Sequence, residues 1–248
     1  SETRWYGPIM VALGAGMWGI ETLFRVNLQQ SFSSDVLVFF EHVFGVLLLI
    51  PLILIGARSY KNYSRRAWGW MMVSAILGSA VGTVCFTASL KLLNISVANV
   101  LLNLQPVWSI YVARLALGER TAKGFKRWAI IAMVAGIVIS TESFDLARYE
   151  IQNPLGLIFV LGTVFSWGTA TVAGRALMTE MPLHVAVPLR FIFGMLGTLV
   201  IVIFNGHFST MASQLPLLLH QDIFREYLKL LLIAGLTPLF FYFYGLRH

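Results

Sequence analysis

Charged residues are scarce in this chain of 248 residues: they make up 12% of it, half the ~25% that is typical of soluble domains. Hydrophobic residues make up 58%, and the mean hydropathy is +0.78. A soluble domain of this length does not need so much apolar surface. The composition therefore excludes an ordinary soluble fold and predicts a multi-pass membrane protein whose main partner is the lipid bilayer.

Cysteine is almost absent as well. The single residue Cys85 lies within an apolar segment, so the sequence offers neither a disulfide framework nor the Cys and His spacing of a metal site. It also contains no nucleophile elbow, phosphate-binding loop or dinucleotide fingerprint. These absences predict that the protein is not an enzyme and uses no cofactor or metal.

Positive charge is in excess, with a net charge of +7 and a pI near 9.8. The basic residues fall in short loops between apolar runs, where Lys and Arg set the orientation of membrane helices, so we predict no nucleic-acid partner. The loops after the second and fourth apolar segments are basic, and the loop after the fifth is acidic. This pattern predicts a cell-membrane (inner or plasma membrane) protein with a cytoplasmic N-terminus.

Eight segments approach the ~20 apolar residues that a membrane-spanning helix needs. In lipid each backbone must satisfy its hydrogen bonds within its own segment, which favours helices over strands, so the expected fold class is all-α. The fifth segment is the weakest. The predicted spans are residues 7–25, 35–56, 67–90, 95–117, 124–141, 154–174, 184–204 and 226–246.

The chain contains an internal repeat. Trp18-Gly19 recurs as Trp167-Gly168, and Phe44-Gly45 recurs as Phe193-Gly194, with the same offset (167−18 and 193−44, both 149). The first repeat, residues 7–141, has five predicted helices, and the second, residues 154–248, has three. Because five is odd, the second repeat starts from the opposite side of the membrane, which is the inverted arrangement of many transporters. We expect two further helices to complete the second repeat, the chain being either a fragment or naturally short.

Several motifs of the first repeat point to a family. In order, they are Leu104-Gln105-Pro106-Val107 in the fourth predicted helix, Leu117-Gly118-Glu119-Arg120 at its end, and Ala135-Gly136 in the fifth. This order resembles the EamA repeat of the drug/metabolite transporter superfamily. The resemblance implies ten helices in two inverted repeats, and export or exchange of small metabolites, often amino acids, without ATP.

Two charged residues lie at matching places in the repeats. Glu41 and Arg190 are again 149 positions apart (190−41), and each is expected within several ångströms of the bilayer midplane. A charge at this depth costs at least ~2.5 kcal/mol, which makes both residues functional candidates. Arg190 could hold a substrate carboxylate and Glu41 an amine, or the two could form a structural ion pair. Glu41 is also a candidate for carrying a coupling proton.

Other polar and aromatic residues inside the spans are candidates with open alternatives. Glu21 and Arg25, four residues apart, are expected to form a structural pair at the outer mouth or to contact substrate. His42 is either a packed, hydrogen-bonded histidine or a proton relay. Trp18 and Trp167 either stack on substrate or pack against neighbouring helices.

The fourth predicted helix contains a proline, which removes one backbone hydrogen bond and kinks a helix. Asn103 and Gln105, just before Pro106, either line a cavity or form interhelical hydrogen bonds. On the third helix, Gly78-x-x-x-Gly82 permits close approach of another helix, within the chain first and in a homodimer second.

Two functions follow as hypotheses. The first is a secondary transporter, most simply an exporter, of small metabolites such as amino acids, working by alternating access around the candidate cavity. The second is a non-transporting membrane scaffold or subunit, which the shortened second repeat suggests.

Overall fold

The computed structural model describes residues 6–120, 124, 127, 130, 131, 133–135, 138 and 153–247. Every regular element in this part of the chain is helical, and seven helices there are long and apolar enough to cross a membrane. The molecule is therefore an all-α, multi-pass membrane protein. The predicted span 124–141 falls mostly outside the described residues.

Seven of the predicted spans have a counterpart in the structure, and several consist of more than one helical element. Three lie in the first half of the first repeat: α1 (Tyr6–Gly19) with α2 (Glu21–Leu28), α3 (Ser34–Ala57), and α4 (Arg65–Val73) with η3 (Ser74–Val81) and α5 (Gly82–Leu92). The fourth consists of α6 (Ile95–Leu102) and α7 (Gln105–Leu117). The second repeat contributes α9 (Pro154–Leu177), α10 (Leu183–Phe204), and α12 (Gln221–Lys229) with η7 (Leu230–Leu236) and α13 (Thr237–Arg247).

Short elements outside the spans are η2 (Tyr60–Asn62), α11 (Phe208–Gln214) and η6 (Leu215–Leu219).

Proline interrupts the fourth span as its chemistry requires. The helix stops at Leu102, and α7 resumes at Gln105 with Pro106 in its first turn, where the missing N–H leaves no intrahelical bond unmade. The kink predicted from Pro106 is thus a complete break of two residues.

Two spans contain a segment of π-helix, η3 in the third span and η7 in the last. Here hydrogen bonds run from residue i to i+5. This arrangement is rare in proteins as a whole, but where it occurs it often lies at a functional site. The two segments lie in equivalent helices of the two predicted repeats.

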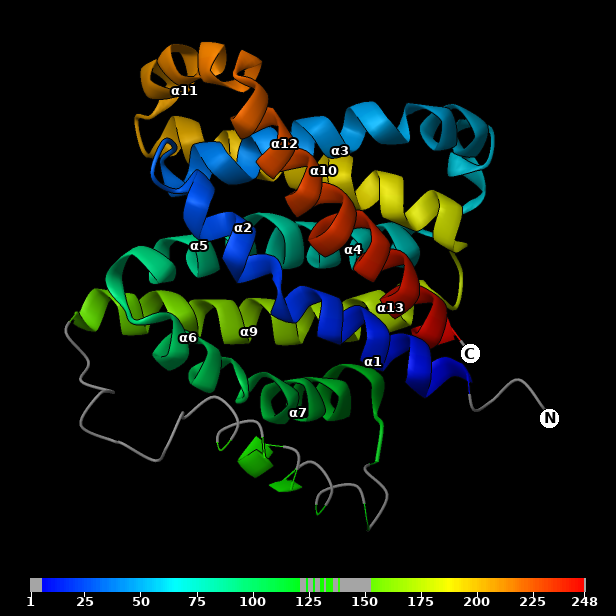
Figure 1. Ribbon diagram of the computed structural model, residues 1–248. Helices are drawn as coiled ribbons and strands as arrows, with labels where there is room; N and C mark the ends of the chain where they lie inside the picture. The colour runs from blue at the N-terminus through cyan, green and yellow to red at the C-terminus, as the bar shows by residue number, and fades with distance from the viewer. Residues whose placement is uncertain are drawn as a thin grey trace.

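Packing between the two predicted repeats is reciprocal. The first helix of one repeat lies against the third helix of the other, as α1 against α13 and α9 against α5, and the two second helices, α3 and α10, pack on each other. Figure 1 shows that equivalent helices run in opposite directions: α3 runs from left to right, and α10 from right to left.

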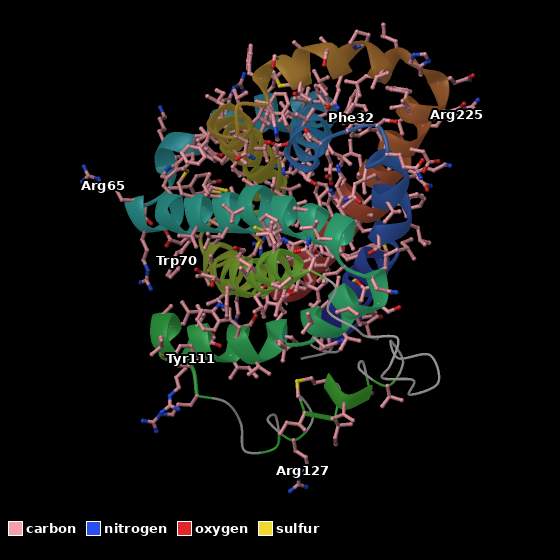
Figure 2. The ribbon with its side chains drawn as sticks, turned by 90° about the vertical axis from the view of Figure 1, so that its left-hand side faces the viewer. Phe32, Arg65, Trp70, Tyr111, Arg127 and Arg225 are labelled. Atoms are coloured by element: carbon pink, nitrogen blue, oxygen red, sulfur yellow. The ribbon has the colours of Figure 1, made fainter. Side chains whose placement is uncertain are left out.

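The two ends of the bundle differ in charge. The end that holds both termini, on the right in Figure 1, carries a set of mostly exposed basic side chains: Arg58, Lys61, Arg65, Arg66, Arg120 and Arg175. At the far end Lys91, Arg225 and Lys229 stand among Asp35, Asp222 and Glu226. Figure 2 shows Arg65 and Arg225 projecting outward at opposite edges, while Phe32 points into the bundle. We call these the basic end and the far end.

Candidate functional site

Arg25 is the centre of a buried cluster of charges. Its Nε donates to Glu21 Oε1 at 2.8 Å and its Nη2 to Glu41 Oε2 at 3.0 Å, while Nη1 donates to Thr87 Oγ1 at 3.0 Å. The Arg25 side chain has no exposed surface, and those of Glu21 and Glu41 are each 8% exposed. We call these four residues the Arg25 cluster; with both carboxylates ionised, its formal charge is −1.

The ion pair predicted between Glu21 and Arg25 is therefore present. Both side chains are buried inside the bundle, and their place at the outer mouth stays a prediction. Glu41 from α3 joins the pair, a third member that spacing along one helix could not reveal.

Glu41 and Arg190 do not form the ion pair that was one alternative for them. Each turns toward the π-helical segment of the other repeat. Glu41 Oε1 lies 3.8 Å from where a Cβ on Gly235 of η7 would stand, and the Arg190 guanidinium lies against Gly78 of η3. The cation that pairs with Glu41 is Arg25 instead of Arg190.

Arg190 is held by hydroxyl groups and one aromatic ring. Its Nε donates to Ser79 Oγ at 2.9 Å and its Nη1 to Ser74 Oγ at 3.1 Å, and its Cζ lies 5.4 Å from the ring centre of Phe243. In the described part of the chain no carboxylate pairs with it. Among the described residues, Arg190 is thus a positive charge at membrane depth whose partners are all neutral.

The π-helix explains why two serines reach one guanidinium. Ser74 and Ser79 are five residues apart, and on a regular α-helix, at about 100° per residue, they would point some 140° away from each other. Hydrogen bonding from i to i+5 widens the turn and brings both hydroxyls to the Arg190 side. Sequence reasoning missed these serines, because the π-helix leaves no recognised pattern in the residues.

Trp167 lies beside the same segment. Its Nε1 donates to Gly78 O at 2.9 Å, and its ring centre lies 5.1 Å from that of Phe86. A Cβ on Gly82 would stand 2.4 Å from the Trp167 ring. Gly78 and Gly82 therefore serve close packing within the chain, and the Trp167 indole has its polar partner there, as the packing interpretation requires.

Trp18 contacts the aromatic run of α13. Its ring centre lies 4.9 Å from that of Tyr242, whose neighbour Phe243 carries the Arg190 guanidinium on its face. Trp18 is only partly buried, so both of its interpretations, packing and stacking on a substrate, still apply.

His42 is packed and hydrogen-bonded. Its Nδ1 lies 2.8 Å from Val38 O, one turn back on α3, and its ring centre lies 5.3 Å from that of Phe191. A Cβ on Gly194 would stand 2.6 Å from the imidazole, so the glycine gives the ring its space. This environment is that of a structural histidine.

Asn103 and Gln105 flank the break in the fourth span. Asn103 Nδ2 donates to Asn99 O at 3.1 Å and Val100 O at 3.2 Å, both in its own helix, so the described bonds of Asn103 are local and not interhelical. The backbone carbonyl of Gln105 accepts a hydrogen bond from Ser109 Oγ at 3.0 Å. The same hydroxyl lies 3.2 Å from the backbone carbonyl of Gly168 on α9. Here the fourth span is bonded to α9 through Ser109.

Three comparisons with known proteins agree with this architecture. Residues 5–141 match the model of the EamA-like transporter family. The riboflavin transporter ImpX of Fusobacterium nucleatum is 28% identical over 211 residues, which cover 82% of this chain and 70% of that protein.

A protein of known crystal structure superimposes with a TM-score of 0.69 over 99% of this chain and 80% of that one. At 13% identity, this likeness concerns the fold alone. The family match spans more than half of the chain, and this chain belongs to the EamA-like transporter family.

Proposed function

We propose that this protein moves a small polar solute across the cell membrane by alternating access between two inverted repeats, residues 7–141 and 154–248. The reciprocal packing of α1 on α13 and of α9 on α5 supports this proposal. In a pair of inverted repeats, the same rearrangement seen from either side exchanges the roles of the two halves.

The observation that carries the choice of solute is the neutral surrounding of Arg190. Glu41 shares Arg25 with Glu21 and so is not a free carboxylate, whereas Arg190 has only neutral partners in the described part of the chain. We therefore place the recognition of the solute on the positive charge of Arg190. We infer that the solute presents an anionic or strongly hydrogen-bond-accepting group to Arg190. An amino-acid carboxylate fits this requirement, and so do the ring carbonyls of a flavin, the solute class of the relative ImpX.

Orientation follows from the charge of the two ends. The basic end carries both ends of the described chain and most of its exposed Arg and Lys, so it is the cytoplasmic end by the positive-inside rule. The N-terminus is then cytoplasmic, and α11 and η6 lie on the outer side.

Flux into proteoliposomes tests the proposal. The purified protein should transport at least one member of a panel of riboflavin, amino acids, nucleobases and cationic drugs. Arg190→Gln should abolish that flux, and Arg190→Lys, which keeps the charge but loses the planar fork, should retain part of it.

Two outcomes count against the proposal. Absence of flux across the whole panel contradicts transport, and binding without flux would favour the non-transporting subunit. Full flux in Arg190→Gln would leave transport standing but remove Arg190 from the site.

A further inference from the structure

A groove opens at the far end of the bundle between α3, α5, α9 and α10, with a volume of about 540 Å³. Its polar lining comes from the ends of helices and their loops, where Asp35, Lys91, Asn205 and His207 lie. Its apolar lining lies deeper along the same helices. The groove is separate from both Arg190 and the Arg25 cluster.

Most of the apolar lining is a stripe on the third span. Val81, Val84, Cys85 and Ala88 line the groove and are half-buried, whereas Gly82, Thr83, Phe86 and Thr87 between them are buried in the bundle. This spacing of i, i+3, i+4 and i+7 is one face of a helix. Phe159 of α9 and Ile201 of α10 also line the groove, and Cys85 Sγ lies 3.4 Å from where a Cβ on Gly162 of α9 would stand.

The distance from Lys91 to the inner end of the stripe matches one leaflet of a bilayer. From Val81 to Lys91 the helix rises by about 15 Å, which is half of a ~30 Å hydrocarbon core. A chain lying in this groove would thus begin at the outer interface and end near the midplane.

Charge at the polar end favours an anionic group. The Asp35 carboxylate is occupied, since it accepts from Asn205 Nδ2 at 2.9 Å and from the Val36 backbone N–H at 3.0 Å, and lies 2.8 Å from His207 Nδ1. Lys91 Nζ donates to Phe32 O at 2.8 Å, and an ammonium has three donors. Lys91 is also exposed, so it is the cation that an incoming group would meet.

We propose that this groove is a binding site for a phospholipid of the outer leaflet. Lys91 receives the phosphate, and one acyl chain lies along the stripe from Ala88 to Val81. The site does not depend on the transported solute, because it shares no residue with the proposed solute site.

Cys85, the single cysteine of the chain, lies halfway along the stripe and reports on its occupancy. In detergent, titration with palmitoyl-oleoyl phosphatidylethanolamine should slow the reaction of Cys85 with a neutral maleimide about fivefold, with saturation. The matched control is Cys85→Ala with Leu54→Cys, which places the thiol on an apolar side chain of α3 that is 67% exposed. The rate there should change less than twofold.

Two further arms separate the parts of the lipid. Diacylglycerol, which lacks the phosphate, should need about ten times more lipid for the same protection, and so should phosphatidylethanolamine with the Lys91→Gln variant. Equal slowing of both cysteines, or none, would overturn the site. Diacylglycerol protecting as well as phospholipid would overturn the role of Lys91 without relying on any variant.

Discussion

Helices α3 and α10 occupy the same place in the two predicted repeats, and each carries one charge at the same position, yet the two charges are stabilised in different ways. Glu41 of α3 enters a cluster with a full opposite charge, whereas Arg190 of α10 has two hydroxyls and a ring. The Glu41 carboxylate is held by a buried guanidinium that it shares with Glu21, while a cation with only neutral partners keeps its attraction for an anion. The comparison supports the proposal that Arg190, and not Glu41, receives the solute.

Removing the central charge of the Arg25 cluster should have the largest effect. Arg25→Ala leaves two buried carboxylates without a cation, which should destabilise the protein by ~3–5 kcal/mol. Thermal unfolding in detergent measures this. Arg175→Ala is the matched control, since its pair with Glu119 (3.1 Å) is exposed and should contribute less than ~1 kcal/mol. Equal melting temperatures of the two variants would contradict the assignment of a structural role.

The hydroxyl partners sharpen the comparison further. Ser79→Ala removes a hydrogen bond to a cation that has few others, so it should cost ~1.5–3 kcal/mol. Thr87→Val removes a bond from Arg25, which keeps both carboxylates, and should cost about half as much. Thermal unfolding in detergent compares the loss of stability in the two variants. A larger loss in Thr87→Val than in Ser79→Ala would contradict the difference drawn between the two arginines.

Space around Arg190 is also limited. A Cβ on Gly78 would stand 2.5 Å from the Arg190 guanidinium and 2.9 Å from Ala170 Cβ, so Gly78→Ala should cost ~1–3 kcal/mol and reduce flux. Gly69 on α4 has no atom within 4 Å of such a Cβ, and Gly69→Ala should stabilise by ~0.5–1 kcal/mol because alanine favours the helix. A tolerated Gly78→Ala would show that the Arg190 contact is loose.

Glu41→Gln should have the smallest effect on stability, because it removes the one unit of negative charge by which the Arg25 cluster exceeds neutrality. If that charge takes up a coupling proton during transport, the variant loses the pH dependence of flux and its rate falls. Proteoliposome flux between about pH 5.5 and 8 measures both. Unchanged pH dependence in the variant would rule out Glu41 as the proton carrier.

Local sequence features predicted much of the fold. Runs of apolar residues located seven spans, Pro106 located the break in the fourth, and the spacing of Glu21 and Arg25 predicted their ion pair. Each of these depends on residues within a few turns of one helix, where the physical rules are local.

The site was less accessible to sequence reasoning. The partner of Glu41 depends on which side of α3 faces α2 and η7, and the partners of Arg190 depend on a π-helix in the third span. Both are consequences of packing between distant segments. Thr87, Ser74 and Ser79 are hydroxyl residues in apolar helices. Because Ser and Thr are common in such helices, the sequence did not single out these three as partners of the two arginines.

The π-helical segment η3 also sets the rotational phase of the helix that continues beyond it. Each residue of an α-helix turns by about 100°, and each residue of the wider π-helix turns by less, so η3 sets the angle between the side chains at its start and those beyond its end. Ser74, the first residue of the segment, faces Arg190, and Thr87, after the segment, faces Arg25. The widened turn therefore allows one continuous span to donate or accept hydrogen bonds at both Arg190 and Arg25.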